Sequence, residues 1–423
     1  MPHRLFEITE ILYLVLGQLA SPRDTVRLAR VCRCLFDQCM PVAWRHVSSV
    51  LRIFNLIPGV RTTWSGVLTT IILPESLTEE NLSRFHLYAS FIDILKVSIR
   101  HGPCPWKLCN WNWLFEYSRN RPLLPKLQTL VFISRDRARS HSLAPISVWL
   151  TLFLSPSLLH FQVADPPNYP TFISQLEAYF IFRSLACICP DLHTLGFFWD
   201  DLYGINPRKA EWSYLLSNEE TSTHHDLSPL FARLKCLTSL RTHIRRLGSL
   251  SPDTLSRLEW LDVTNIITLN GLIGGVKIPY TLLTSLKHIG ILECAATIVL
   301  ETLPMSVVTL TSVEIDSKLD GDLIHQVTSN LAMFCPLLTD LALHAGSPSI
   351  EAGSLAPLAL IAHLRRLCIT CSKNLLPAPQ SDVFSYIHDL LPGLKTLEFR
   401  DEGSAYRKSQ MLLLECQGSS TIF

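Results

Sequence analysis

LTDLAL at residues 338–343 and LRRLCI at residues 364–369 share one arrangement, with leucine at the first and fourth positions and an aliphatic residue at the sixth. Four further copies follow this arrangement with any apolar residue at the sixth position: LQTLVF at 127–132, LHTLGF at 192–197, LEWLDV at 258–263 and LKTLEF at 394–399. Alternation at the fourth and sixth positions predicts a short strand with one buried face. A single strand cannot bury that face by itself, so the copies are expected to stack on one another.

Weaker copies extend the series and start at Leu68, Ile92, Leu158, Leu237, Leu286 and Leu310. From Leu258 to Leu364, successive copies start 28, 24, 28 and 26 residues apart. This spacing resembles that of leucine-rich-repeat proteins, whose units have about 20–29 residues. The resemblance implies an α/β repeat fold, a solenoid with parallel strands on its concave side and helices outside.

These patterns divide the chain into three segments. We expect a helical head over residues 1–58, a solenoid of about 12 irregular units over 59–400, and a cap or tail over 401–423. The apolar run at 411–414 suits a last covering helix. The longest step between copies contains a polar insertion near 200–226, which is either a binding element or extra length that a solenoid tolerates.

The head contains three apolar segments. Residues 5–19 place apolar side chains three and four positions apart, which predicts a first amphipathic helix. Ser21, Pro22 and Asp24 provide an N-cap, a first-turn proline and an acidic residue, so a second helix is expected to start there. Pro41 is expected to open a third helix.

Within these segments the sequence resembles an F-box. ITEIL at 8–12, DTVRLARVCR at 24–33 and AWRHV at 43–47 match the family's three helical motifs, although Thr9 stands where the family pattern has proline. Similar heads open many fungal proteins of this size. The resemblance implies that the chain is a substrate-recognition subunit of a cullin-based (SCF) ubiquitin ligase, and that its head docks on the Skp-type adaptor. The residues implied to dock are Ile8, Ile11, Leu12, Leu16, Leu28, Val31 and Trp44.

A protein substrate of unknown identity is expected on the concave sheet, at strand positions between the inward leucines. The candidate residues are Phe198, Trp260, Asp262, His288, Glu314, Asp316, Asp340, His344, Arg366, Glu398 and Arg400. Trp260 and Arg366 rank first, because interfaces concentrate binding energy in a few aromatic and arginine side chains. Their mixed charges favour a protein or peptide ligand over nucleic acid, which would need a basic stripe.

Composition excludes several classes of protein. Charged residues make up 17% of the chain and the net charge is +1, so no long-range field directs it to nucleic acid or a membrane. The best transmembrane candidate, residues 140–164, contains prolines and histidines that disfavour a spanning helix, and no cleavable leader is visible. Thirteen scattered cysteines indicate free thiols in the reducing cytoplasm or nucleus, with no metal site.

Motifs for catalysis are missing from the sequence. It contains no phosphate loop, nucleophile elbow or His-Glu-x-x-His motif, so neither catalytic residues nor a cofactor is expected. The main hypothesis is therefore a non-catalytic ligase subunit. The alternatives are a leucine-rich-repeat scaffold whose F-box does not engage a ligase, and an enzyme whose active site escapes these patterns.

Overall fold

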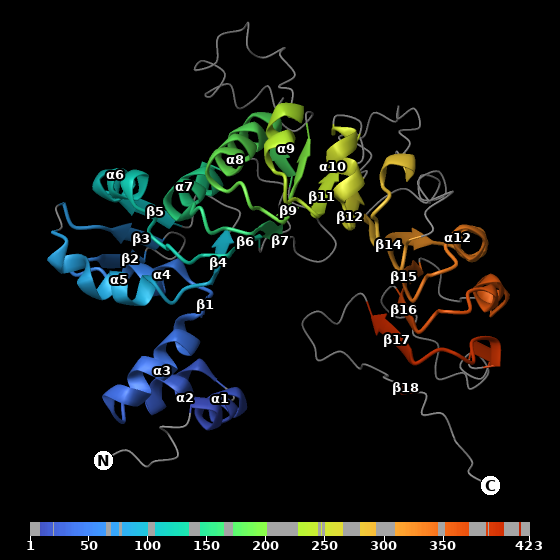
Figure 1. The fold of residues 1–423 in the computed structure, drawn as a ribbon, viewed down its shortest axis with the longest axis horizontal. Helices are drawn as coiled ribbons and strands as arrows, with labels where there is room; N and C mark the ends of the chain where they lie inside the picture. The colour runs from blue at the N-terminus through green and yellow to red at the C-terminus, as the bar shows by residue number, and fades with distance from the viewer. Residues whose placement is uncertain are drawn as a thin grey trace, which may run out of the picture. The chain divides into compact units, whose positions relative to one another are not determined.

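The computed structural model describes residues 9–19, 21–64, 69–75, 78–99, 106–134, 144–164, 172–200, 227–243, 247, 250–264, 280–292, 309–345, 352–371, 386–387, 389–401 and 414–415. The chain divides into two compact units. Unit 1 comprises residues 1–225 and 233–236, and unit 2 comprises residues 226–232 and 237–423. Within each unit, parallel strands alternate with helices along the chain (Figure 1).

Three helices open unit 1. They are α1 (Thr9–Gln18), α2 (Pro22–Ala29) and α3 (Arg33–Trp44). The predicted start of the second helix is confirmed, since the Ser21 side chain accepts a hydrogen bond from the Asp24 N–H. The interior of this helical head is filled by Leu12, Leu16 and Leu35.

The third helix differs from the expectation. We expected it to open at Pro41, but α3 begins at Arg33 and continues through this proline. Met40, Ala43 and Trp44 are buried on both sides of Pro41. Their burial outweighs the loss of the hydrogen bond that a proline nitrogen cannot donate.

The main sheet of unit 1 consists of short parallel strands that neighbour one another in chain order. The strands are β1 (His46–Val47), β4 (Ile94–Ile99), β6 (Thr129–Ser134), β7 (His160–Ala164) and β9 (Thr194–Gly196). Leu95 lies opposite Leu130, which lies opposite Phe161. All three side chains are buried, so the inward positions of neighbouring strands form one core.

Helices connect these strands. They are α4 (Val50–Phe54), η2 (Glu80–Leu82), α5 (Ser83–Ala89), α6 (Asn112–Asn120), α7 (Ala144–Phe153) and α8 (Gln175–Ile188). Figure 1 shows α6, α7 and α8 side by side along one side of the strands. Their buried side chains, such as Trp149 and Phe182, pack toward the sheet.

Unit 1 also contains two small sheets. In one, β2 (Arg61–Trp64) runs antiparallel to β3 (Thr69–Ile72), which runs parallel to β5 (Trp106–Cys109). In the other, β8 (Phe172–Ser174) runs parallel to β10 (Phe198–Asp200). The repeat expected from Leu68 is therefore not part of the main sheet, because its strand, β3, pairs with β2 and β5 instead.

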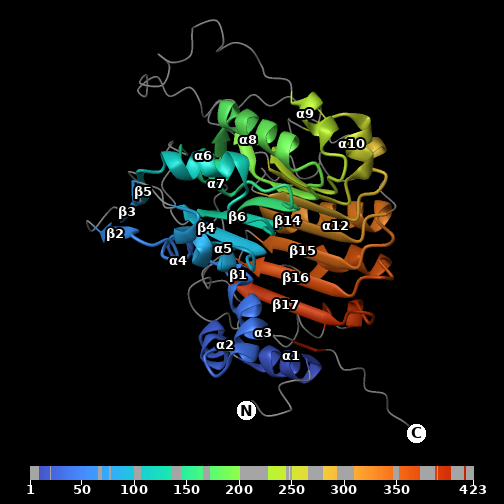
Figure 2. The same ribbon diagram turned by 60° about the vertical axis from the view of Figure 1, so that its left-hand side comes forward.

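The sheet of unit 2 follows the same principle over more strands. Its parallel strands are β11 (Ser239–His243), β12 (Trp260–Thr264), β13 (His288–Leu292), β14 (Ser312–Leu319), β15 (Asp340–Ala345), β16 (Arg366–Cys371) and β17 (Thr396–Asp401). The connecting helices are α10 (Pro252–Arg257), η5 (Tyr280–Leu282), α12 (Gly321–Phe334) and η6 (Ala352–Leu360), and α9 (Ser228–Arg233) precedes β11. Figure 2 shows β14 to β17 side by side in chain order.

The predicted repeat is confirmed in this sheet. In each copy the strand begins two residues after the first leucine. In LTDLAL, which starts at Leu338, strand β15 begins at Asp340. The first, fourth and sixth residues of that copy, Leu338, Leu341 and Leu343, are all buried. They share the core with buried residues of α12 such as Leu331. The fold is therefore an α/β repeat with parallel strands, as the leucine spacing predicts.

The end of the chain differs from the expected covering helix. Residues Leu414–Glu415 form a short strand, β18, that runs antiparallel to β17 and covers part of its edge. Residues 201–226 of the expected insertion near 200–226, and most of the tail after residue 401, lie outside the described residues. Among the described helices, none combines the length and the apolar character that crossing a membrane would need.

Candidate binding face

Strand residues that alternate with the buried leucines of unit 2 point away from the helices. We call the surface that they form the polar face. Its described residues are Ser239, Arg241, Trp260, Asp262, His288, Gly290, Ser312, Glu314, Asp316, Asp340, Ala342, His344, Arg366, Cys368, Thr370, Thr396 and Glu398. Because the strands are in register, equivalent residues of successive repeats are neighbours about 4.8 Å apart.

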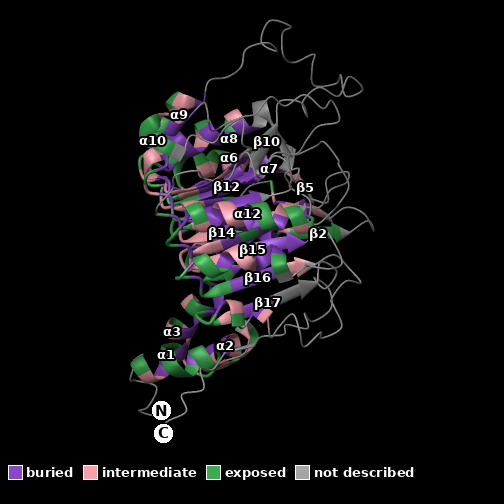
Figure 3. Cartoon of the chain, turned by 90° about the vertical axis from the view of Figure 1, so that its right-hand side faces the viewer, coloured by how far each residue is buried: buried purple, intermediate pink, exposed green. Residues whose placement is uncertain are grey.

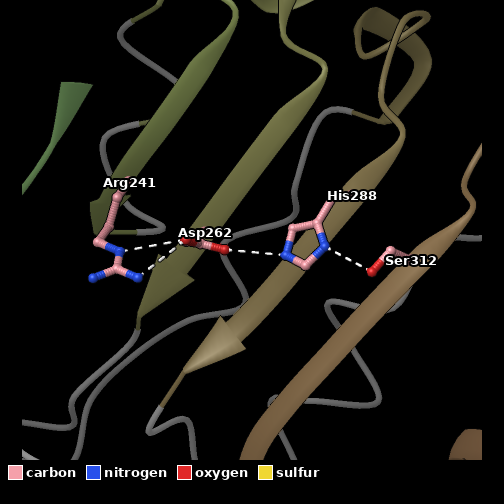
Figure 4. Close-up of polar contacts among 4 residues, drawn as sticks. All are labelled: Arg241, Asp262, His288 and Ser312. Atoms are coloured by element: carbon pink, nitrogen blue, oxygen red, sulfur yellow. Dashed lines mark hydrogen bonds and ion pairs between the residues drawn. The ribbon is translucent and has the colours of Figure 1, made fainter. Parts of the chain in front are cut away.

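Four of these side chains form a continuous polar chain across β11, β12, β13 and β14 (Figure 4). Arg241 donates from Nε and Nη2 to Asp262 Oδ2, at 3.3 Å each. Asp262 Oδ1 lies 3.4 Å from His288 Nε2, and His288 Nδ1 lies 2.9 Å from Ser312 Oγ. A carboxylate only accepts, so a proton on Nε2 would face Asp262 Oδ1, although this contact lies at ion-pair distance without hydrogen-bond geometry. The Ser312 hydroxyl then donates to Nδ1.

The two central members of this chain are buried, with Asp262 8% exposed and His288 4% exposed. Burial by itself would raise the pKa of Asp262, because it disfavours a charged carboxylate. The contact with His288 and the positive charge of Arg241 outweigh burial and hold the pKa below its ordinary value of 3.8. Asp262 is therefore ionised at neutral pH.

Gly290 makes room for this carboxylate. It lies opposite Asp262 on β13. A Cβ atom at residue 290 would overlap Asp262 Oδ1 and would lie 3.1 Å from its Cγ. Any larger residue at this position would push the Asp262 side chain away from Arg241 and His288.

Trp260 covers the buried histidine. Its ring lies flat on the His288 imidazole, with centroids 3.5 Å apart and planes at 14°. The Trp260 side chain also contributes to the low pKa of the Asp262 carboxyl. Trp260 is nevertheless 45% exposed, so much of the indole faces solvent while its other side is held by the polar chain.

Other charged residues of the polar face also have hydrogen-bond partners. His344 Nδ1 lies 2.9 Å from Asp316 Oδ1, and Thr339 donates to Asp340 Oδ2 at 2.6 Å. Arg366 donates from Nε and Nη2 to Glu398 Oε1, at 3.1 and 2.8 Å. These contacts fix the side chains in place and leave oxygen lone pairs on the carboxylates for further hydrogen bonds.

A serine, a histidine and an aspartate in contact are also the groups used for nucleophilic catalysis. Here the histidine is buried under Trp260, and the Ser312 N–H donates within the sheet to Lys287 O at 3.0 Å. An oxyanion would need unused N–H donors beside the serine. The arrangement therefore supports the position of Trp260 better than it supports a reaction at Ser312. No group of three possible metal ligands occurs among the described side chains.

The structure brings most of the nominated substrate residues together on the polar face. These are Trp260, Asp262, His288, Glu314, Asp316, Asp340, His344, Arg366 and Glu398. Arg400 belongs to β17, but its side chain lies outside the described ones. Phe198 was expected in the main sheet and instead belongs to β10, because β9 ends at Gly196 and Phe197 turns into the core.

The head residues nominated for a partner divide into three groups. Leu12, Leu16 and Trp44 are buried within the chain, Ile11 and Leu28 are half-buried, and Val31 is 71% exposed. Trp44 packs on Tyr88 with ring centroids 4.6 Å apart, and the Arg52 guanidinium lies 4.3 Å above its ring. Trp44 therefore joins the head to α4 and α5. Ile8 lies outside the described residues.

Sequence reasoning missed Arg241, Gly290 and Ser312. Aligning the repeat copies with one another could have identified these residues. The alignment places Trp260, His288 and Ser312 at one position, and Asp262 and Gly290 two residues later. In the head, reasoning missed the exposed residues Tyr13 and Leu14. Their signal is an apolar run that extends around the whole helix.

The in-register parallel strands, the buried leucine repeat and the interposed helices define an α/β repeat protein with a leucine-rich-repeat-like sheet. No family model and no curated protein sequence matches the chain. Among solved structures, the leucine-rich repeat-containing protein LegL7 from Legionella pneumophila is similar with a TM-score of 0.37 and 11% sequence identity. That match covers 73% of this chain and 90% of the LegL7 chain. At this TM-score the likeness adds nothing to what the strands themselves show.

Proposed function

We propose that the chain is a non-catalytic substrate-recognition subunit of a cullin-based (SCF) ubiquitin ligase in the cytoplasm or nucleus. Its F-box-like head would bind the Skp-type adaptor, and the polar face of unit 2 would hold a protein substrate. Other subunits would perform the transfer of ubiquitin, so the chain needs no active site and no cofactor.

One observation carries this proposal: the head exposes apolar side chains although its own interior is already filled. Tyr13 is 55% exposed, Leu14 and Val31 are 71% exposed, and Val42 is 39% exposed. Figure 3 shows exposed residues along α1 and α2. Apolar surface of this kind on such a small helical unit is typical of an interface with another protein.

A second function, a repeat scaffold without a ligase, is favoured by Trp44. The specific part of the F-box resemblance is the Val-Cys-Arg string at 31–33 followed by Trp44, yet Trp44 is 8% exposed and packs within the chain on Tyr88. Thr9 in place of proline also departs from the family pattern. In the scaffold function, the exposed head residues would contact a protein other than the adaptor.

The two functions are separated by capture of a purified Skp-type adaptor on the immobilised full-length chain. We expect the wild type to retain the adaptor and Leu14→Glu and Val31→Glu to lose it, because both side chains are exposed and their exchange leaves the core intact. Met333→Glu is the matched control, since Met333 of α12 is also 71% exposed. Failure of the wild type to retain the adaptor would leave the scaffold function. Equal retention by all variants would show that the adaptor binds without Leu14 and Val31, and would contradict the docking surface proposed here.

A further inference from the structure

The polar chain places buried polar groups on the face of a sheet, which costs free energy. Asp262 and His288 are almost fully buried polar groups, and burying a charge is unfavourable unless it is paired. At the positions that correspond to Asp262 in β15 and β16, the same face carries Ala342 and Cys368. The fold therefore accepts small, uncharged residues in this row, and the polar chain needs another explanation.

The consequence of the polar chain is a fixed, exposed indole. His288 supports the ring of Trp260 by stacking on it, Ser312 Oγ lies within hydrogen-bond distance of its Nδ1, and Asp262 Oδ1 lies 3.4 Å from its Nε2. A large aromatic side chain that is already immobile loses little conformational entropy when a ligand binds. Trp260 thus has the properties of a binding anchor.

The surroundings of this indole are acidic. The described polar-face positions of β12 to β15 contain four carboxylates and neither lysine nor arginine: Asp262, Glu314, Asp316 and Asp340. The two arginines of the face stand at either side of these strands, and each is paired, Arg241 with Asp262 and Arg366 with Glu398. Lys287, which precedes β13, is paired with Glu259. A positively charged ligand complements this surface.

We propose that the polar face binds an extended basic segment of a partner protein, with one arginine side chain stacked on the exposed side of Trp260. A guanidinium is planar and weakly hydrated, so it stacks on an indole better than an ammonium does. Neighbouring basic residues of the segment pair with Glu314, which is exposed, and with Asp340. The identity of this partner as a ubiquitination substrate rests on the proposed function, but the binding itself does not require the ligase.

The test uses the purified full-length chain and fluorescence anisotropy of the labelled peptide Gly-Arg-Gly-Arg-Gly-Arg-Gly. We expect saturable binding that weakens with salt, and binding several-fold weaker for the matched lysine peptide. Trp260→Ala should weaken binding of the arginine peptide about 10-fold, and Trp260→Phe should retain part of it. Glu314→Gln should weaken binding less than Trp260→Ala, because it removes one exposed charge.

Phe180→Ala is the matched control, since Phe180 on α8 is 44% exposed and lies in unit 1. Equal affinity of wild type and Trp260→Ala would overturn the proposal, as would absence of binding at millimolar peptide or a preference for the matched glutamate peptide or for a single-stranded oligonucleotide. Capture of the adaptor by the head is measured separately. Peptide binding without adaptor capture would contradict the ligase function alone, and adaptor capture without peptide binding would contradict the basic-segment inference alone.

Discussion

Units 1 and 2 bury the same kind of leucine row but place different residues on the alternating strand positions. In unit 1 the described alternating residues are His46, Ile94, Lys96, Thr129, Val131, Ile133, His160, Gln162, Thr194 and Gly196. Only Lys96 among them is charged at every pH of interest, whereas the polar face of unit 2 contains five carboxylates and two arginines.

A histidine contact on the strands of unit 1 makes the contrast clearer. His160 Nδ1 lies 2.9 Å from Thr194 Oγ1, and burial together with the neighbouring His193 lowers the pKa of His160. This histidine is therefore neutral at pH 7 and contacts no carboxylate within the described part of unit 1. His288 of unit 2 instead contacts an ionised Asp262. The leucine row determines the fold in both units, so the charges of unit 2 are a property of that face and not of the repeat.

The largest loss of stability is expected from Gly290→Ala. This substitution would disrupt the polar chain, which distinguishes the polar face of unit 2 from the strands of unit 1. The added Cβ would overlap Asp262 Oδ1, so the carboxylate must leave Arg241 and His288. We expect the free energy of unfolding to fall by about 2–3 kcal/mol in urea denaturation. Gly353→Ala is the control, because a Cβ there meets nothing within 4 Å. Equal stability of the two variants would show that the polar chain does not depend on Gly290.

A smaller and pH-dependent effect is expected from Asp262→Asn. The folded pKa of Asp262 lies below the ordinary value of 3.8, so its contribution to stability is complete above that pH and is lost as the pH falls through the folded pKa. At pH 7 the variant should be less stable by about 1–2 kcal/mol, and the difference should shrink below pH 4. Lys96→Ala in unit 1 should change stability little at any of these pH values. A difference that is constant between pH 7 and pH 3.5 would contradict the assigned charge on Asp262.

The sequence predicted the leucine row well and the charged contacts poorly, for a physical reason. Burial of Leu338, Leu341 and Leu343 depends on local alternation, which any short window of sequence contains. The contact between Asp262 and His288 joins residues on separate strands and depends on register, which requires all copies to be aligned first. Local patterns therefore could not distinguish a paired charge from a free one.

The head and the first strand show a related limit. Periodicity on α1 indicates that one side is buried, but both sides are apolar, so Leu14 and Leu16 could not be separated from the pattern alone. Strand β1 has two residues, His46–Val47, and no leucine repeat precedes it. Its place in the sheet comes from pairing with β4, which a local pattern does not contain.

The smallest change in stability is expected for charged residues just before the strands of unit 2. One pair of neighbours there has opposite charges, and another pair has like charges. Lys287 Nζ lies 2.9 Å from Glu259 Oε2, across β12 and β13. At the same position before β16 and β17, Arg365 and Lys395 are neighbours through the bond from Lys395 N to Arg365 O. Both are exposed, and neither has a side-chain ion pair among the described residues. Like charges on adjacent strands are unfavourable.

Lys395→Glu should therefore stabilise the chain by about 0.2–1 kcal/mol, since it converts a repulsion into an attraction across adjacent strands. Lys287→Glu should have the opposite sign, because it replaces the pair with Glu259 by two like charges. Both changes should shrink in 1 M salt, where exposed charges are screened within about 3 Å. Urea denaturation measures the change in the free energy of unfolding for both variants, each at low and at high salt. A loss of stability in Lys395→Glu at low salt would mean that Arg365 and Lys395 are balanced by carboxylates beyond the described residues.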